Sequence, residues 1–184
     1  MKKFVSKNQI IDAAINIAGE KGWEKTTVRE IAKEINYSTI KIYSEFKSKE
    51  DLLKAIQIQG FMMLKSEYLK SIQFIDQREE KLIELTLAHY RFSHQQKTYY
   101  DLMFQMDGST CSLPKEGVLA NAGEPINQLL SDVAGYKVDK PLFLHWWSLA
   151  HGFIAITRMM GDNEENNNRI LRALMTKFIK GIKG

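Results

Sequence analysis

The side chains suited to catalysis or metal binding are few and poorly grouped in this chain of 184 residues. Cys111 is the only cysteine, so an internal disulfide and metal or redox motifs built on cysteine pairs are excluded. His89 and His94 flank Tyr90 without a carboxylate or cysteine at metal-binding spacing. An enzyme could use His151 with a Glu or Ser, but the sequence has no nucleophile elbow or phosphate loop. We therefore expect no enzyme, no metal and no cofactor.

A different chemistry is suggested by residues 27–46, which hold hydroxyl and lysine side chains suited to phosphates and short side chains suited to base edges. The first part of this stretch predicts a short helix. Thr27 and Glu30 form a capping-box pattern at its start. One face of it is apolar and consists of Val28, Ile31, Ala32 and Ile35.

A second short helix follows at once. Asn36 stands where a left-handed residue often ends a helix, and Ser38 can cap the next one. Ile42 and Phe46 then point inward, one turn apart. Two helices joined by three or four residues are the layout of a DNA-binding helix-turn-helix.

Residues 10–53 resemble the N-terminal domain of the TetR family of transcriptional regulators, over roughly a quarter of the chain. The matching residues are the IIDAA opening, Glu20-Lys21-Gly22 with Trp23, Thr26-Thr27-Val28, Ile31-Ala32, Ser38, Tyr43, Phe46 and Lys47-Ser48-Lys49-Glu50. The resemblance implies an all-α fold and a DNA-binding head whose second short helix enters the major groove.

The resemblance also assigns roles to individual residues. It places Thr39, Ile40 and Ser44 nearest the bases. Lys41, Tyr43 and Lys49 would face phosphates, and the helix starts near Thr27 and Ser48 suit phosphate as well. Arg29 could hold a guanine edge. The predicted DNA-contacting residues are Thr27, Arg29, Ser38, Thr39, Ile40, Lys41, Tyr43, Ser44 and Lys49.

Some positions depart from the family pattern. Asn36 and Ile40 stand where the family usually has Gly, and Lys41 stands where it has Thr or another small residue. Glu45 would repel a phosphate unless it faces a cytosine amine or a lysine. These departures bear on the operator sequence more than on DNA binding itself. Tyr43 has two interpretations, a phosphate contact or packing against the first helix.

The rest of the chain predicts helices only, about nine in total with the head. The expected helices cover residues 7–19, 27–35, 38–46, 48–75, 77–92, 97–106, 124–133, 139–160 and 170–182, and Ser48 with Asp51 forms a capping-box pattern at the start of the fourth. Residues 107–123 are expected to be irregular, with helix in part of them left open as an alternative. Trp23 is expected to fill the core of the three-helix head, and Gly60 to weaken the long fourth helix. We place a DNA-binding domain at 1–47 and a helical ligand-binding and dimerisation domain at 48–184.

The body is rich in aromatic and Met side chains, which indicates a pocket for a small apolar or aromatic ligand. The candidate ligand contacts are Phe61, Met62, Tyr90, Tyr99, Met103, Phe104, Trp147 and His151. Such residues at helical spacing also serve as plain core. The segment His145–Gly152 resembles a tryptophan–histidine–glycine signature of one TetR branch, in which Gly152 would let another helix approach closely.

The last two helices are the expected homodimer surface, because the segment from Leu142 to Met160 is apolar nearly all round. The net charge of +4 is mild, and residues 1–55 hold 11 Lys and Arg against 8 Asp and Glu. Neither a membrane span nor a signal peptide is evident, so a cytoplasmic location is expected. The resemblance implies a ligand-released repressor that binds an operator as a dimer. The alternatives are a relative whose body binds a protein partner without a small inducer, and an activator.

Overall fold

Capping residues set the helix boundaries of the head. Ser6 accepts a hydrogen bond from the Gln9 amide at the start of α1 (Lys7–Lys21), and Gly22 ends this helix with φ +83°. Thr27 and Glu30 form the predicted capping box of α2 (Val28–Glu34). Ser38 caps α3 (Thr39–Glu45) through the Lys41 amide. The helix-turn-helix expected from the sequence is confirmed.

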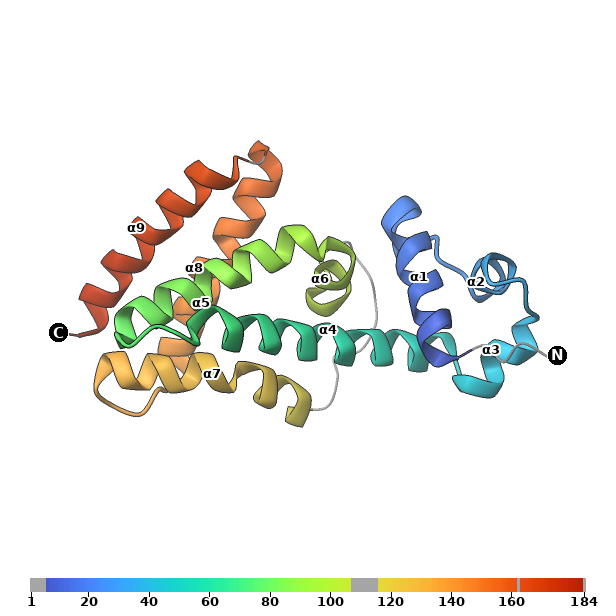
Figure 1. Ribbon diagram of the computed structural model, residues 1–184, viewed down its shortest axis with the longest axis horizontal. Coiled ribbons are helices and arrows are strands. Elements are labelled where there is room, and N and C mark those ends of the chain that lie inside the picture. The colour runs from blue at the N-terminus through green and yellow to red at the C-terminus, as the bar shows by residue number, and fades with distance from the viewer. Residues whose placement is uncertain (1–5, 107–115, 162, 184) are drawn as a thin grey trace. The chain divides into compact units, whose positions relative to one another are not determined.

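The computed structural model describes residues 6–106, 116–161 and 163–183, and these ranges contain nine helices and no strands (Figure 1). The other six helices are α4 (Lys49–Ile72), α5 (Arg78–Gln95), α6 (Lys97–Phe104), α7 (Glu116–Ala134), α8 (Lys140–Met160) and α9 (Glu164–Ile182). The all-α prediction is confirmed. Cys111, the basic residues at 1–5 and the expected irregular stretch at 107–115 lie outside the described residues.

The predicted start of α7 at Glu124 is wrong. The helix begins at Glu116, so Gly117 and Gly123 lie inside it. Each glycine weakens a helix by about 1 kcal/mol, but tertiary packing outweighs that cost. The inner face of α7 is buried and consists of Ala122, Ile126, Leu129, Leu130 and Val133.

The described residues divide into two compact units. One contains the residues up to Met62 together with 96–106 and 116–118, and the other contains the residues from Met63 to Gln95 and those from Leu119 onward. The first unit therefore joins the head to the first half of α4 and to α6. The boundary after Lys47 stays a prediction about function, since compactness divides the chain elsewhere.

The head and α6 share one core in the first unit. Trp23 is buried, as expected, and its indole N–H donates to the Thr98 carbonyl at 2.9 Å. A methyl group on Gly19 would lie 3.3 Å from the Thr98 hydroxyl. The first turn of α6 is thus held directly against the C-terminal end of α1 and the loop that follows it.

Gly60 allows α4 and α6 to pack closely. From the sequence, we expected only that this glycine would weaken the helix. A methyl group at this position would lie 2.5 Å from Met103 Sδ and 3.2 Å from the Tyr99 ring. Only glycine fits this contact without displacing a buried side chain.

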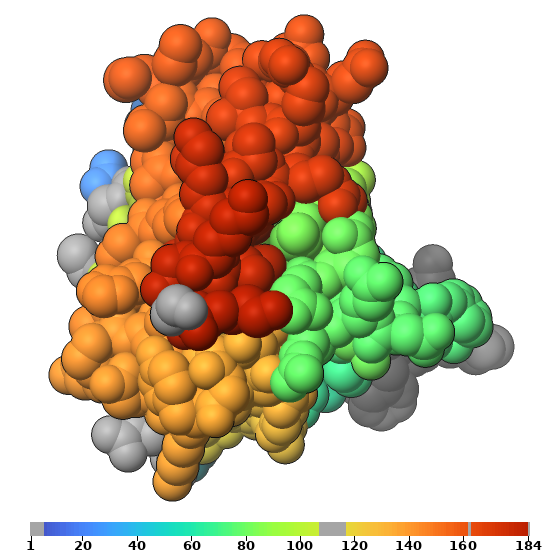
Figure 2. Space-filling view, turned by 90° about the vertical axis from the view of Figure 1, so that its left-hand side faces the viewer, coloured from blue at the N-terminus to red at the C-terminus, as the bar shows by residue number. Residues whose placement is uncertain are grey.

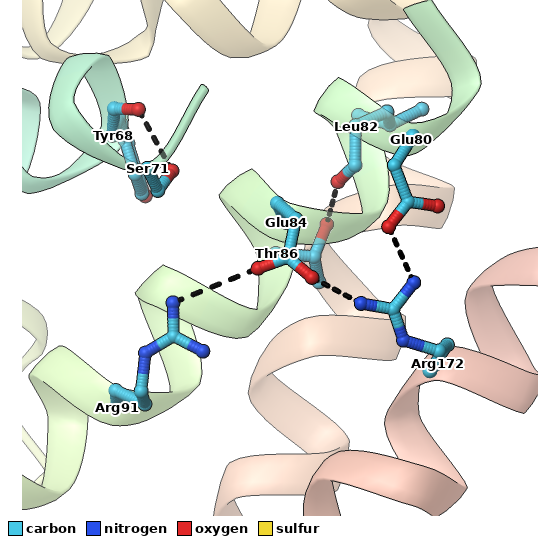
Figure 3. Close-up of polar contacts among 8 residues, drawn as sticks. All are labelled: Tyr68, Ser71, Glu80, Leu82, Glu84, Thr86, Arg91 and Arg172. Carbon is cyan, nitrogen blue, oxygen red and sulfur yellow. Dashed lines mark hydrogen bonds and ion pairs between the residues drawn. The ribbon is translucent and has the colours of Figure 1, made fainter. Parts of the chain in front are cut away.

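In the second unit, ion pairs fix α9 to α5. Arg172 of α9 binds Glu80 at 2.6 Å and also Glu84, and Arg91 lies 3.9 Å from Glu84 (Figure 3). Figure 2 shows α9 in red at the surface, with α8 in orange on one side and α5 in green on the other. Since one face of α9 is bound to α5, its opposite side and the adjoining side of α8 are left open in the single chain.

Candidate nucleic-acid interface and effector region

The turn between α2 and α3 is fixed by a Schellman motif. Asn36 adopts φ +56°, the left-handed conformation predicted for it. The Tyr37 amide donates to the Ala32 carbonyl at 2.9 Å, and the Asn36 amide donates to the Lys33 carbonyl at 3.1 Å. These bonds end α2 and set the angle at which α3 leaves it.

The inner and outer faces of α3 differ sharply. Ile42 and Phe46 are 1% and 4% exposed and anchor the helix in the head, whereas Ile40 is 78% and Tyr43 51% exposed. The exposure of Tyr43 favours the phosphate-contact interpretation over packing against α1. An isoleucine so exposed in the first turn of α3 adds little to the core, and a folded head gains nothing by exposing it.

The polar side chains of α3 form local contacts. Lys41 Nζ lies 2.6 Å from Glu45 Oε1, and the Ser44 hydroxyl donates to the Lys41 carbonyl at 2.7 Å. The hydrogen bond from Lys41 is the main reason why the pKa of Glu45 lies below its usual value. Facing a lysine was one of the two conditions under which Glu45 was expected not to repel a nearby phosphate.

The remaining predicted DNA contacts lie on or beside the same two helices. Thr27, Arg29 and Ser38 are exposed, and Thr39 is half-buried in the first turn of α3. Lys49 is half-buried at the first position of α4. The Ser48 hydroxyl accepts from the Asp51 amide at 3.1 Å, so the predicted cap of α4 is present.

Four of the predicted ligand contacts meet in the first unit, where α4 packs against α6. Phe61 contacts Phe104 edge to face, with ring centroids 5.5 Å apart. Tyr99 and Met103 are buried against Gly60. Burial, and to a smaller extent Asp12, raises the pKa of the Tyr99 hydroxyl. Met62, by contrast, is 69% exposed and points away from this cluster.

Gln57 belongs to this cluster and was missed from the sequence. Its side chain is completely buried, and its amide N–H donates to the Leu102 carbonyl of α6 at 3.1 Å. Its Oε1 atom is buried without a hydrogen-bond partner in the described part of the chain. The sequence signal that could have identified Gln57 is its position: it is a polar residue within the apolar stripe of α4, one turn before Phe61.

The other aromatic candidates lie in the second unit. Trp147 packs on His151 at 3.8 Å between ring centroids, and His151 lies 5.3 Å from His89. Burial is the main cause that lowers the pKa of His151 to about 4 and that of His89 well below its usual value. Both histidines are therefore neutral at pH 7, as core histidines are. Tyr90 is buried and accepts a hydrogen bond from Asn167 at 2.9 Å.

Other features of the described residues limit the chemistry. Among them, no group of three or more His, Cys, Asp and Glu could hold a metal, and no helix is long and apolar enough to cross a membrane. A surface hollow of about 200 Å³ between α4 and α5 is polar, and no predicted ligand contact lines it. Its lining residues are Glu67, Lys70, Ser71, Ala88, Arg91, Phe92 and Gln95.

Comparisons with known proteins agree with this geometry. Residues 10–56 match the model for bacterial regulatory proteins of the tetR family. The biofilm operon icaADBC negative transcriptional regulator IcaR of Staphylococcus aureus is 26% identical over 196 residues, which cover 95% of this chain and 99% of IcaR. The fatty acid metabolism regulator protein of Bacillus subtilis is 35% identical over 80 residues, covering 44% of this chain and 36% of that protein.

The fold also matches that of a solved structure. The transcriptional regulator FadR from Bacillus subtilis, in complex with stearoyl-CoA, superposes with a TM-score of 0.67 at 17% identity, over 97% of this chain and 98% of FadR. The fold and the α2–α3 head together define a helix-turn-helix transcriptional regulator. Within this class, the match over residues 10–56 and the regulators among its relatives support a TetR family regulator.

Proposed function

We propose that this regulator is a repressor that binds a palindromic operator as a homodimer and is released by a small apolar or aromatic ligand. The observation that carries DNA binding is the outer face of α3, where Ile40 is 78% and Tyr43 51% exposed beside Lys41 and Ser44. IcaR, similar along nearly its whole length, is named a negative regulator, which supports repression. Such a role places the protein with the chromosome in the cytoplasm and requires no enzymatic activity.

The proposed division of labour on DNA follows from exposure. Ile40 would contact a thymine methyl, and Thr39 and Ser44 would lie near the base edges. Tyr43, Lys41 and Lys49 would bind phosphates, as would the start of α2 at Thr27. Residues 1–47 would thus supply DNA binding, and residues 48–184 ligand binding and dimerisation.

The test of DNA binding is titration of the purified protein with DNA from upstream of its own gene at several salt concentrations. We expect tight binding with a steep negative salt slope, and a slope smaller by about 1 for Lys49→Ala. Tyr43→Ala should weaken binding about ten-fold. Tyr136→Ala and Lys137→Ala are matched controls, because Tyr136 is 53% exposed and both lie in the loop before α8. Absence of binding at low salt, on this DNA and on a random pool, would remove the proposal.

Dimerisation through α8 and α9 is supported by an exposed stripe on α8. Leu144, Gly152 and Ile156 follow one another at multiples of four residues, so they share a face. Leu144 is 43%, Ile156 53% and Met159 81% exposed. Apart from its chain neighbours and its own helix backbone, no atom of the described residues lies within 4 Å of a methyl group built on Gly152, so this face has room for a second helix. A dimer of this kind would place two recognition helices in successive major grooves, roughly 34–36 Å apart.

Light scattering after gel filtration tests the dimer. The wild type should have twice the mass of one chain, and Ile156→Asp should have the mass of one chain. Phe74→Asp is the control, because Phe74 is 90% exposed and lies outside α8 and α9. A wild type that runs as a monomer at micromolar concentration would contradict the proposal.

Ligand release has a physical route within the first unit. The cluster around Gly60 joins α4 to α6, and the Trp23 bond joins α6 to the head. A ligand that displaces α6 would therefore displace α1 as well. To move the regulator from 99% bound to 99% released, it must favour the released form by about 5.5 kcal/mol. FadR in complex with stearoyl-CoA supports a small-molecule effector for this fold.

A further inference from the structure

The α4–α6 cluster contains one polar atom whose burial the fold does not explain. Gln57 is completely buried, and its Oε1 atom has no hydrogen-bond partner among the described residues. A buried polar group without a partner destabilises the folded chain, because water no longer solvates it. Such an atom inside an aromatic cluster therefore needs a reason.

The orientation of the Gln57 amide is fixed by its other end. Its nitrogen lies 3.1 Å from the Leu102 carbonyl oxygen, in the last turns of α6. Exchanging the nitrogen and the oxygen would bring two acceptors together, so the nitrogen must face Leu102. Oε1 is thus fixed as a hydrogen-bond acceptor, and only a group that carries an N–H or O–H can bond to it.

The α4–α6 interface in which Gln57 bonds Leu102 is aromatic and apolar. Phe61 lies one turn further along the same face of α4 and packs against Phe104, and Tyr100 lies 4.6 Å from Phe104 between ring centroids. Met103 and Tyr99 close the contact at Gly60. This environment suits an apolar or aromatic body and disfavours a charged group.

We infer that Gln57 is the polar anchor of the effector site, and that its Oε1 accepts a hydrogen bond from a neutral donor on a largely apolar ligand. The ligand class is thus a hydrophobic alcohol, phenol or N–H compound; a carboxylate would meet the negative end of the amide dipole. The inference rests on the proposed ligand release and specifies its chemistry. The same amide holds the Leu102 carbonyl, so a ligand that moves Gln57 moves α6.

Two probes that differ only in the donor test the inference. 2-Naphthol carries one O–H, whereas in 2-methoxynaphthalene a methyl group replaces that hydrogen. Calorimetry should show that the wild type binds 2-naphthol about ten-fold more tightly. Gln57→Met should remove this preference. Gln59→Met, the same change two residues away at a half-buried position of α4, should keep it.

The inference is overturned if the wild type binds both probes equally, if it binds neither, or if the preference persists in Gln57→Met. If that variant does not fold, the wild type labelled with ¹⁵N-glutamine decides. 2-Naphthol should shift the side-chain amide signal of Gln57 more than 2-methoxynaphthalene does, and equal shifts would contradict the assignment. Operator binding without a probe is measured separately, so failure of the proposed function is distinguishable from failure of this anchor.

Discussion

The two aromatic clusters differ in how their polar atoms are satisfied. In the second unit, the Trp146 N–H donates to the Thr86 hydroxyl at 2.9 Å, and that hydroxyl donates to the Leu82 carbonyl at 2.7 Å (Figure 3 shows the second bond). Tyr68 hydrogen-bonds His89 in the same cluster. In the first unit, Gln57 Oε1 has no partner in the described residues. The surroundings of Trp146 are therefore those of a core, whereas the first cluster keeps one acceptor that we propose for a ligand. Elsewhere in the second unit, Asn168 Oδ1 is also buried without a hydrogen-bond partner among the described residues.

The comparison shows that aromatic content does not distinguish a pocket from a core. Both clusters are rich in ring contacts, and both were equally good candidates from the sequence. The property that distinguishes them is whether the buried donors and acceptors have hydrogen-bond partners, because a fold gains no stability from an acceptor that it leaves unsatisfied.

The largest loss of stability is expected at Trp146, in the core of the second unit. Trp146 is completely buried and makes a hydrogen bond, so Trp146→Ala should destabilise the protein by about 3–5 kcal/mol. Denaturant unfolding measures this. Tyr136→Ala, at a 53% exposed aromatic residue, is the control and should change stability by less than about 0.5 kcal/mol. Similar losses in the two variants would show that the second cluster is not a core.

A second prediction concerns pH. The pKa of His151 is lowered to about 4, mainly by burial, and the pKa of His89 is lowered as well. As the pH falls below 6.5, these histidines therefore become protonated in the unfolded chain before they do in the folded one. Stability that is present above pH 6.5 is lost as the pH falls toward 4. Each histidine contributes a slope of about 1.4 kcal/mol per pH unit at most. His151→Gln should flatten the loss between pH 6.5 and 5, whereas exposed His145→Gln should not. An unchanged slope in His151→Gln would contradict burial of the neutral ring.

A third prediction tests the close packing of the first cluster. Gly60→Ala should destabilise by about 1–2 kcal/mol, because the strain against Met103 and Tyr99 exceeds the gain in helix propensity. Gly123→Ala is the matched change in α7, where the nearest contact is 4.0 Å away, and should stabilise by about 0.5–1 kcal/mol. Equal effects of the two changes in thermal unfolding would disprove the packing role of Gly60.

The smallest effect is expected at Gln57. Gln57→Met loses the bond to the Leu102 carbonyl, which destabilises the fold, but it also removes a buried acceptor without a partner, which stabilises it. The loss and the gain nearly cancel. The free energy of unfolding should change by less than about 1 kcal/mol. A loss of about 3 kcal/mol would contradict this balance and would mean that the bond to the Leu102 carbonyl is mainly structural.

Local signals were sufficient to predict the head. The capping and turn signals of the head act over a few residues only. The structure has each of them in its predicted role: Thr27 with Glu30, Asn36 and Ser38. The inward position of Trp23 was also predictable. Its bond to the Thr98 carbonyl was not, since it joins residues 75 positions apart.

Tertiary contacts decided what the sequence alone left open or misjudged. Gly60 looked like a weak point, but its meaning comes from Met103 on another helix. Gly117 and Gly123 suggested an irregular stretch, but burial of one face extends α7 over both. Met62 follows Phe61 directly and yet is exposed, because neighbouring residues of a helix point about 100° apart.

Coupling between ligand and DNA is tested by the affinity of the wild type for its operator, measured by fluorescence anisotropy with and without saturating 2-naphthol. We expect tight, salt-sensitive binding without the compound and binding at least ten-fold weaker with it. Operator affinity that stays the same while calorimetry shows the compound bound would contradict the coupling between the α4–α6 cluster and the DNA-binding head.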